Sequence, residues 1–360
     1  MSVRALLILT IATVIACAVA ANLLWTSPRI EANQRGKPLF AALSDPQRQV
    51  DGIEIETPDY HLQLQREHEG WAAISEASYP ARKDTATGLV TALAGLRRLE
   101  PKTRRSEWFS NLGVEDRQVD GSRSRQLRLL DGDEVVAEVL VGKTSASLGA
   151  DPVGGTFVRI PGDRQSWLVS GVVDIPASLE DWFEPLFNIR GPELRRITIS
   201  VGGRTVFDAW RDSEKNPYAL ASAKGVGEDA NAAINGGLLQ RLERVLVATS
   251  FTDVRPASEV TTPVDARTVR FESAAGLTVE ARLAEADGTP WVTFYAQADT
   301  SPEAREQAAA IAARTEGWAF RLPNEHMLAL KVAIADLTTK EGSQDGDAGR
   351  IITDPSYFRR

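Results

Sequence analysis

Cysteine is almost absent from this chain of 360 residues, and the single one, Cys17, lies in an apolar stretch near the N-terminus. One cysteine cannot form a disulfide within the chain, and it cannot build a cysteine-based metal site alone. The near absence of cysteine therefore excludes a small disulfide-stapled domain. It neither requires nor excludes an oxidising compartment.

An excess of basic residues is also lacking. Lysine and arginine number 41 against 49 aspartate and glutamate residues, so the formal net charge is -8 and the pI is near 5.2. Nucleic-acid binding relies on a basic surface that neutralises phosphates. We therefore expect no nucleic-acid partner, and we interpret the acidic balance as a contribution to solubility.

Sequence patterns that carry known chemistry are missing as well. His61, His68 and His326 stand in no metal-ligand spacing, and no G-x-S-x-G nucleophile elbow occurs. The stretch Gly142-Lys143-Thr144 lacks the upstream glycine of a phosphate-binding P-loop, and no helical pattern follows it. We interpret that stretch as a strand ending in a turn. The sequence predicts no catalytic residue, no metal site and no cofactor.

The longest apolar run is present near the N-terminus and covers residues 5–25 without a charge. A helix of about 20 such residues spans a bilayer, and Trp25 at its end suits the membrane interface. A cleaved secretion signal ending at Ala20 and a lipoprotein signal ending at Cys17 remain alternatives. We favour an uncleaved transmembrane anchor, because the apolar residues continue beyond the usual length of a signal sequence.

Positive charges alone do not orient this anchor. Arg4 precedes the run, whereas Arg29, Arg35 and Lys37 follow it. A very short flank before an apolar run is nevertheless typical of a signal-anchor. We therefore predict a single-pass protein of the inner membrane, with its soluble body in the periplasm.

Composition divides the rest of the chain. Prolines and mixed polar residues after the run indicate a tether, and the C-terminal segment, rich in glycine and aspartate, indicates a disordered tail. Two domains are expected between them. The predicted order is a flank, an anchor, a tether, a first domain, a second domain and a tail, at residues 1–4, 5–25, 26–50, 51–190, 191–339 and 340–360.

The two domains repeat one order of strands. Alternating apolar and polar residues predict strands in the first domain at residues 53–56, 62–65, 70–74, 126–130, 135–141, 156–160 and 166–169. The matching strands of the second domain are at residues 197–200, 205–210, 218–222, 268–272, 278–283, 291–295 and 318–320. We predict an α+β fold of two similar antiparallel sheet-plus-helix domains, produced by internal duplication. Chance similarity between the halves is the alternative.

Each domain also has a helix after its third strand. The first helix, over residues 84–99, has Leu89 and Leu93 on its apolar face and Asp84 in position to cap its start. The second helix is expected to start near Asp229, with adjacent glycines at 236 and 237 weakening or kinking it. An extra helix over residues 301–314 begins with a serine and a proline, a favourable start.

Aromatic residues outside the predicted strands are the remaining candidates for a binding surface. They are Trp108, Phe109, Trp182, Phe183 and Phe187. Aromatic side chains are enriched at the centres of protein–protein interfaces. The alternative interpretation is that these five side chains fill the cores of the two domains.

Several stretches of the first domain, taken in order, resemble one known family. They are GWAAISEASYPARKDTATGLVTALAGLRRLE, then Asn111-Leu112-Gly113-Val114-Glu115, then Val139-Leu140-Val141-Gly142-Lys143, TFVRIPGDRQSWLVS, LEDWFEPLF and LRRITIS. The pattern resembles the family called domain of unknown function 4340 over residues 50–210. The helix stretch is the best match, and Val114 stands where the family more often has leucine.

The resemblance implies one N-terminal membrane helix and an extracytoplasmic body. Many members are associated with ABC-type transport systems related to those of gliding motility, and no activity or catalytic residue is established. We therefore expect a membrane-anchored accessory protein without catalysis, whose partner is a membrane protein such as an ABC transporter component.

One alternative is a glycan- or lipid-binding module that uses an interdomain cleft. Another is a hydrolase with a dispersed active site, since catalytic triads are defined by geometry. The small-molecule ligand, if any, is not identified by the sequence.

Overall fold

The structure, a computed structural model, describes eight stretches of the chain. They are residues 34–45, 48–68, 70–145, 154–189, 193–223, 233–247, 249–298 and 301–339. The chain separates into two compact units, of which unit 1 ends at Glu184 and unit 2 begins at Pro185. The sequence predicted a boundary after residue 190. Each unit combines an antiparallel sheet with helices, which confirms the predicted α+β class.

The predicted flank, anchor and tail, at residues 1–4, 5–25 and 340–360, lie outside the described residues. Within the part of the chain that the structure describes, no helix has the length and apolar content needed to cross a bilayer.

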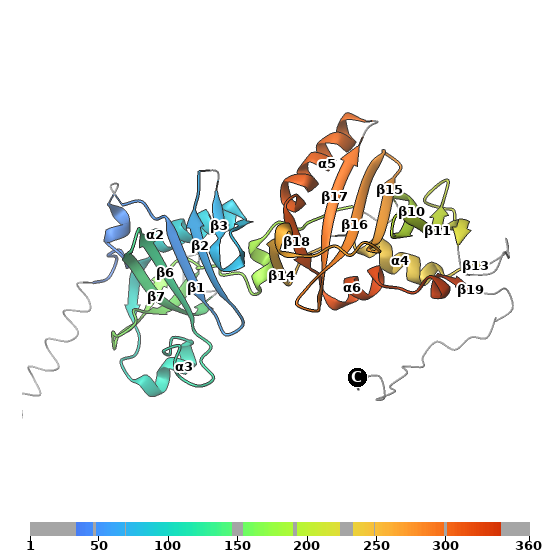
Figure 1. Ribbon diagram of the computed structural model, residues 1–360. Coiled ribbons are helices and arrows are strands. Elements are labelled where there is room, and N and C mark those ends of the chain that lie inside the picture. Colours follow the sequence, from blue (N-terminus) through green and yellow to red (C-terminus); the bar gives the residue numbers. More distant parts are fainter. Residues whose placement is uncertain are drawn as a thin grey trace, which may run out of the picture. The chain divides into compact units, whose positions relative to one another are not determined.

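Within the described residues, nine strands form the sheet of unit 1 in the order β4-β3-β2-β1-β6-β7-β8-β9-β5, and Figure 1 shows its central strands. The strands are β1 Gly52–Glu56, β2 His61–Arg66, β3 Trp71–Ala73, β4 Tyr79–Ala81, β5 Arg97–Pro101, β6 Arg125–Asp131, β7 Glu134–Ser145, β8 Gly155–Arg159 and β9 Ser166–Ser170. Every strand predicted for this unit is present. β4 and β5 were not predicted, because neither shows a clear apolar–polar alternation.

Alternation along β1 explains its central place in the sheet. Ile53 and Ile55 project to the same face and are fully buried. The register places Ile53 between Leu64 of β2 and Leu129 of β6, and both of these side chains are buried as well. Burying each such side chain contributes about 1.5–3 kcal/mol. The core of unit 1 is therefore built on this face.

The main helix of unit 1, α2 Lys83–Gly95, buries an apolar stripe that includes Leu89 and Leu93, as predicted. The predicted end at residue 99 is wrong, because residues 97–99 belong to β5. Its N-cap position is Arg82, whose side chain makes no capping hydrogen bond. The prediction that Asp84 caps the helix is wrong, because Asp84 already lies in the first turn. The shorter helices of the unit are η1 Ala42–Ser44, η2 Ile74–Glu76, η3 Ser106–Trp108, α3 Phe109–Leu112 and η4 Leu179–Trp182.

Part of the predicted tether is folded. Leu39, Phe40 and Val50 are buried. The Leu39 amide donates to the Leu96 carbonyl at 2.8 Å, and the Arg98 guanidinium donates to the Pro38 carbonyl, also at 2.8 Å. The tether prediction is therefore wrong for residues 34–45 and 48–50. The prolines suggested a tether, but the apolar side chains between them bind this segment to the unit.

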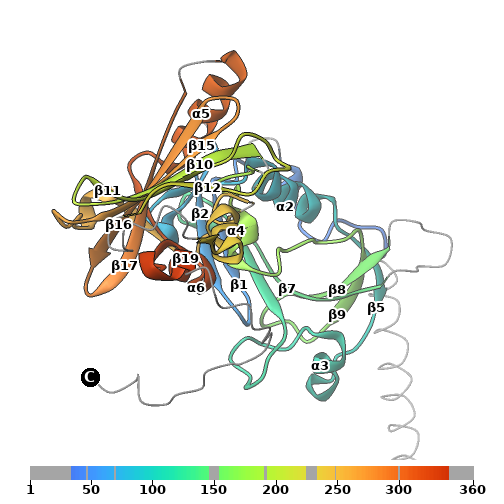
Figure 2. The same ribbon diagram turned by 90° about the vertical axis from the view of Figure 1, so that its right-hand side faces the viewer.

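Within the described residues, eight strands form the sheet of unit 2 in the order β12-β11-β10-β15-β16-β17-β18-β14, several of which are seen edge-on in Figure 2. They are β10 Leu194–Val201, β11 Arg204–Trp210, β12 Ala219–Ala223, β14 Asp253–Pro256, β15 Arg267–Ser273, β16 Leu277–Ala286, β17 Thr289–Ala298 and β18 Trp318–Arg321. Only β14 was not predicted. A separate pair joins β13 Ala233–Ile234 to β19 Thr338–Thr339.

The two large sheets share one strand order. β12-β11-β10-β15-β16-β17-β18-β14 repeats β3-β2-β1-β6-β7-β8-β9-β5, and only β4 lacks a counterpart among the described strands of the second sheet. The register agrees at the centre, where Ile197 of β10 lies between Ala209 of β11 and Phe271 of β15. All three are fully buried, in the arrangement that Ile53 has in unit 1. The units therefore have the same core architecture.

The helices of unit 2 are α4 Gly236–Arg244, α5 Pro302–Thr315, α6 Asn324–Leu330, η6 Ala257–Glu259 and η7 Ile334–Leu337. α5 lies along β17 (Figure 1), and Ser301 caps it by accepting a hydrogen bond from the Ala304 amide at 3.0 Å, as the sequence suggested. Asn235 caps α4, so the glycines at 236 and 237 start this helix and do not interrupt it. The predicted start near residue 229 and the predicted kink are wrong for that reason.

Candidate functional site

The structure separates the five aromatic residues that the sequence offered as an interface. Phe109, Trp182, Phe183 and Phe187 are buried, with at most 6% of each residue exposed, whereas 52% of Trp108 is exposed. An interface made of all five is therefore contradicted. The core interpretation holds for four of them, and Trp108 alone of this group presents a large surface.

The buried members of this group pack within their own units. In unit 1, Phe183 meets Tyr79 edge to face, with ring centroids 5.6 Å apart. In unit 2, Phe187 meets Phe294 in the same manner at 4.7 Å. Trp182 is fully buried. Pairs of this kind add about 0.5–1.5 kcal/mol beyond the burial of their area, so these side chains stabilise the cores.

Trp108 belongs to a lobe between β5 and β6, residues 102–124, whose helix α3 lies below the labelled strands of unit 1 in Figures 1 and 2. The neighbouring Phe109 is held under the Arg159 guanidinium, whose carbon lies 4.5 Å from the ring centroid. Arg159 is only 2% exposed, and it donates to the Val114 carbonyl at 2.8 Å and to Asp116 at 2.5 Å. The lobe is thus fixed to the sheet, and Trp108 projects from a supported segment.

Two of the stretches that resemble the family meet at the base of this lobe. Lys143 donates from Nζ to the Asn111 carbonyl at 2.8 Å. Gly113 has a φ of +71°, and Gly142 faces the backbone of residues 112 and 113 without room for a side chain. β7 continues through this stretch to Ser145, so the predicted turn at residues 142–144 is wrong. The lysine of the apparent phosphate motif holds a backbone carbonyl.

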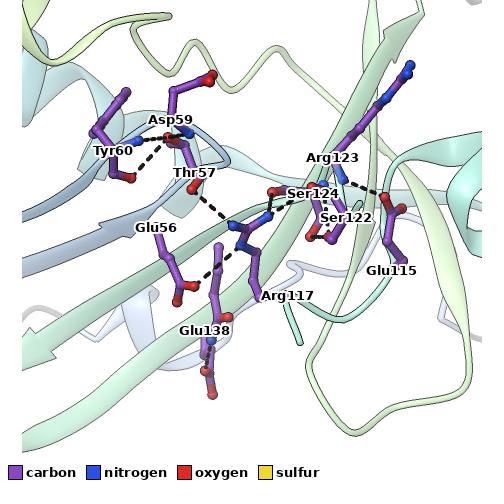
Figure 3. A network of polar contacts seen from close by, with 11 residues as sticks. Glu56, Thr57, Asp59, Tyr60, Glu115, Arg117, Ser122, Arg123, Ser124 and Glu138 are labelled. Carbon is purple, nitrogen blue, oxygen red and sulfur yellow. Dashed lines mark hydrogen bonds and ion pairs between the residues drawn. The ribbon is translucent and has the colours of Figure 1, made fainter. Parts of the chain in front are cut away.

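Arg117 joins the lobe to the end of β1, at the centre of the contacts in Figure 3. It donates to the carbonyl of Thr57 at 3.0 Å, and to those of Ser122 and Ser124 at 3.2 Å and 3.0 Å. Its Nε also lies 3.5 Å from Glu56. The three hydrogen bonds all come from the two terminal nitrogens of the guanidinium and end on backbone oxygens, whereas the contact with Glu56 is an ion pair. The network therefore positions the lobe.

Unit 2 holds a pocket of about 520 Å³ between α4 and α6, two helices that lie side by side in both ribbon views. Small-molecule sites usually have about 300–1,000 Å³. Leu238, Arg241 and Arg244 line it from α4, and Leu328 lines it from α6. Lys331, just after α6, completes the basic part of the lining. The sequence pointed to none of these residues.

His326 also lines this pocket, with 14% of its side chain exposed. Burial lowers the pKa of His326 below its ordinary value of 6.5; the nearby Glu325 carboxylate opposes this shift and the charge of Arg244 adds to it. The imidazole is therefore neutral at pH 7. His61 and His68 are exposed. Across the described ranges, no group of three histidine, cysteine, aspartate or glutamate side chains is placed to hold a metal ion.

A second, smaller pocket of about 210 Å³ in unit 2 is lined in part by an arginine that has unpaired nitrogens. Arg267 lines it, and its Nε and Nη2 are buried without a hydrogen-bond partner among the described residues. Burial lowers the pKa of this group. The guanidinium of Arg211, in contrast to that of Arg267, has a charged partner, because it donates to Glu243 at 2.9 Å. Tyr218 donates to the same carboxylate at 2.9 Å. Lys331 lines both pockets.

Comparison with known proteins identifies one family. The model of a family described as Domain of unknown function (DUF4340) matches residues 47–269. The match covers more than half of the 360 residues and runs from before β1 into β15. No curated protein and no solved structure is significantly similar to the chain.

Proposed function

Since the chain belongs to the DUF4340 family, we propose that it is a membrane-anchored, extracytoplasmic accessory protein that acts by binding a partner and not by catalysis. The proposed anchor is the uncharged run over residues 5–25. The proposed location is the inner membrane, with the two units in the periplasm. The proposed partner is a membrane component of an ABC-type transport system.

The observation that carries this proposal is the exposure of Trp108 on a supported lobe. Trp108 is 52% exposed, so about half of its surface is not covered by the rest of the protein. Tryptophan is among the residues most enriched at interface hot spots. Trp108 directly precedes Phe109 in the chain, and Arg159 holds Phe109 in place. A partner that covers Trp108 therefore gains apolar burial without having to order the lobe.

Internal duplication is the second part of the proposal. The common strand order and the matching register of Ile53 and Ile197 support it, because independent origins would not be expected to repeat eight strand positions. Duplication would supply two rigid bodies from one ancestral unit. The lobe with Trp108 distinguishes the first unit, since it occupies the connection between β5 and β6, whereas the matching connection of the second unit, between β14 and β15, is shorter and contains only η6.

The test is a site-directed crosslink from the full-length chain in its native membrane. A photoreactive amino acid placed at Glu107, beside Trp108, should form one main crosslinked product, and mass spectrometry should identify it as an ABC-type transport component. Trp108→Ala should abolish the product. Trp210→Ala removes another exposed tryptophan, 42% exposed on β11, and should leave the product unchanged. A product that survives Trp108→Ala, or that contains no membrane protein, contradicts the proposal.

A further inference from the structure

We propose that the pocket between α4 and α6 binds an amphipathic anion, meaning a small molecule with an apolar body and a carboxylate or phosphate head. The site lies wholly within unit 2 and contains none of the residues that carry the proposed partner contact. It therefore goes beyond the proposed function, and it does not depend on it.

Three cations at this pocket carry the first step. Among the described residues, the side chains of Arg241, Arg244 and Lys331 have no hydrogen-bond or ion-pair partner. Arg241 and Arg244 are three positions apart on α4, so they project from one face of the helix. Like charges that line one pocket repel each other, and an anion bound among them reduces this repulsion. A guanidinium group can donate two parallel hydrogen bonds to two oxygens of one carboxylate or phosphate.

Carboxylates at the pocket only partly offset these charges. Glu325 and Asp336 are the acidic residues of the lining. The Glu325 carboxylate lies 3.7 Å from Nε2 of His326, and 80% of the Glu325 side chain is exposed. His326 is neutral at pH 7 and adds no charge. Three cations therefore face two carboxylates, and the pocket favours a ligand with a negative head.

Apolar side chains give the other half of the recognition. Leu238 continues the row of Arg241 and Arg244 on α4, one turn earlier. Ala329 lines the pocket from α6, and Leu328 at its edge is 62% exposed. A volume of about 520 Å³ beside these side chains accommodates a short alkyl chain or ring system. Apolar lining next to unpaired cations matches an amphiphile better than a bare inorganic anion.

The binding test uses the full chain in nanodiscs of neutral phosphatidylcholine, with octanoate and hexyl phosphate as probes. Octanol supplies a similar chain without the charge, and inorganic phosphate supplies a charge without the chain. Saturable binding of octanoate or hexyl phosphate, roughly tenfold or more tighter than that of both controls, is the expected result. Equal binding of octanol, equal binding of inorganic phosphate, or no saturable binding of either probe overturns the assignment.

Variants locate the site. Arg241→Gln with Arg244→Gln should weaken the binding of the better probe by roughly tenfold or more, because a charge-assisted hydrogen bond is lost. The matched control, Arg204→Gln with Arg305→Gln, removes two other exposed arginines of unit 2 and should leave binding unchanged. Leu328→Gln tests the apolar edge and should also weaken binding. Thermal unfolding confirms that each variant is folded. Equal affinities for the pocket and control variants overturn the assignment.

The source of the natural ligand is distinguished by extraction of the purified full chain. Anionic membrane lipid recovered with the wild-type chain, and depleted by Arg241→Gln with Arg244→Gln, identifies a lipid headgroup. A soluble amphiphile with the same dependence identifies a free metabolite. Recovery of no anionic amphiphile that depends on these arginines contradicts the occupancy of the pocket in the cell.

Discussion

Gly142 lies against the carbonyl oxygen of Leu112 so closely that a Cβ at position 142 would overlap it. The same Cβ would be 2.8 Å from the Val114 side chain and 2.9 Å from the Gly113 carbonyl oxygen. Two of these three obstacles are backbone atoms, which cannot turn away as a side chain can. Gly142 therefore allows β7 to approach the base of the lobe that carries Trp108.

We expect Gly142→Ala to lower the free energy of unfolding by about 2–4 kcal/mol, because the backbones must separate. Gly88→Ala is the control: Gly88 lies inside α2, where an added Cβ meets nothing within 4 Å. Alanine there should raise stability by about 0.5–1 kcal/mol. Urea unfolding measures both changes. A Gly142→Ala protein as stable as the wild type would refute the close approach.

Arg159 should be essential for the order of the lobe. Its buried guanidinium holds the Val114 carbonyl and Asp116, and it covers Phe109. Without this guanidinium the buried Val114 carbonyl loses its donor, and leaving a buried acceptor unsatisfied typically costs about 1–3 kcal/mol. Arg159→Gln should therefore speed limited proteolysis within residues 102–124 more than elsewhere. Arg305→Gln, on the exposed face of α5, should not change the cleavage pattern.

The stability of unit 2 should depend on acid through Asp208. Its carboxylate accepts hydrogen bonds from Arg196 at 2.8 Å and 2.6 Å, and these bonds are the main cause that lowers the pKa of Asp208 below its ordinary 3.8. A lowered pKa stabilises the fold above the ordinary value, and this contribution disappears as the pH falls through the lowered pKa.

We expect Asp208→Asn to lose about 1–3 kcal/mol of unfolding free energy at neutral pH. Its stability should then change less than that of the wild type between about pH 6 and about pH 2. Denaturant unfolding across this range measures the difference. Glu306→Gln, which removes an exposed carboxylate of α5 in the same unit, is the control and should preserve the wild-type slope. Parallel pH profiles for Asp208→Asn and the wild type would contradict the assignment.

Two half-buried arginines of unit 2 should respond in opposite ways to the same substitution. Arg267 leaves Nε and Nη2 buried and unpaired among the described residues, whereas Arg211 pairs with Glu243. Arg267→Met should leave stability unchanged or raise it by up to about 1 kcal/mol, because an unsatisfied polar group is removed. Arg211→Met should lower it by about 3 kcal/mol, since Glu243 would then be buried without its cation. Thermal unfolding distinguishes them, and a larger loss for Arg267→Met would exclude this reasoning.

Much of each sheet followed from the sequence. Apolar–polar alternation such as Ile53-Glu54-Ile55-Glu56 predicted the inner strands, because one buried face imposes a period of two. The capping pair Ser301 and Pro302 predicted the start of α5 for a local reason as well. Short elements such as β4 and α6 were missed. β4 has only three residues with a proline at its centre, and a helix of seven residues such as α6 covers barely two turns, so neither shows a clear period.

The binding surfaces were decided by packing. Trp108 and Phe109 are adjacent and chemically alike, yet only Trp108 is exposed, because Arg159 approaches Phe109 from a distant strand. The pocket in unit 2 likewise forms only because Arg241 on α4 and Lys331 after α6 come to line the same cavity. No period or motif encodes such a meeting. Local patterns therefore determined which segments form strands and helices, and contacts between segments far apart in the chain decided which side chains remain available for binding.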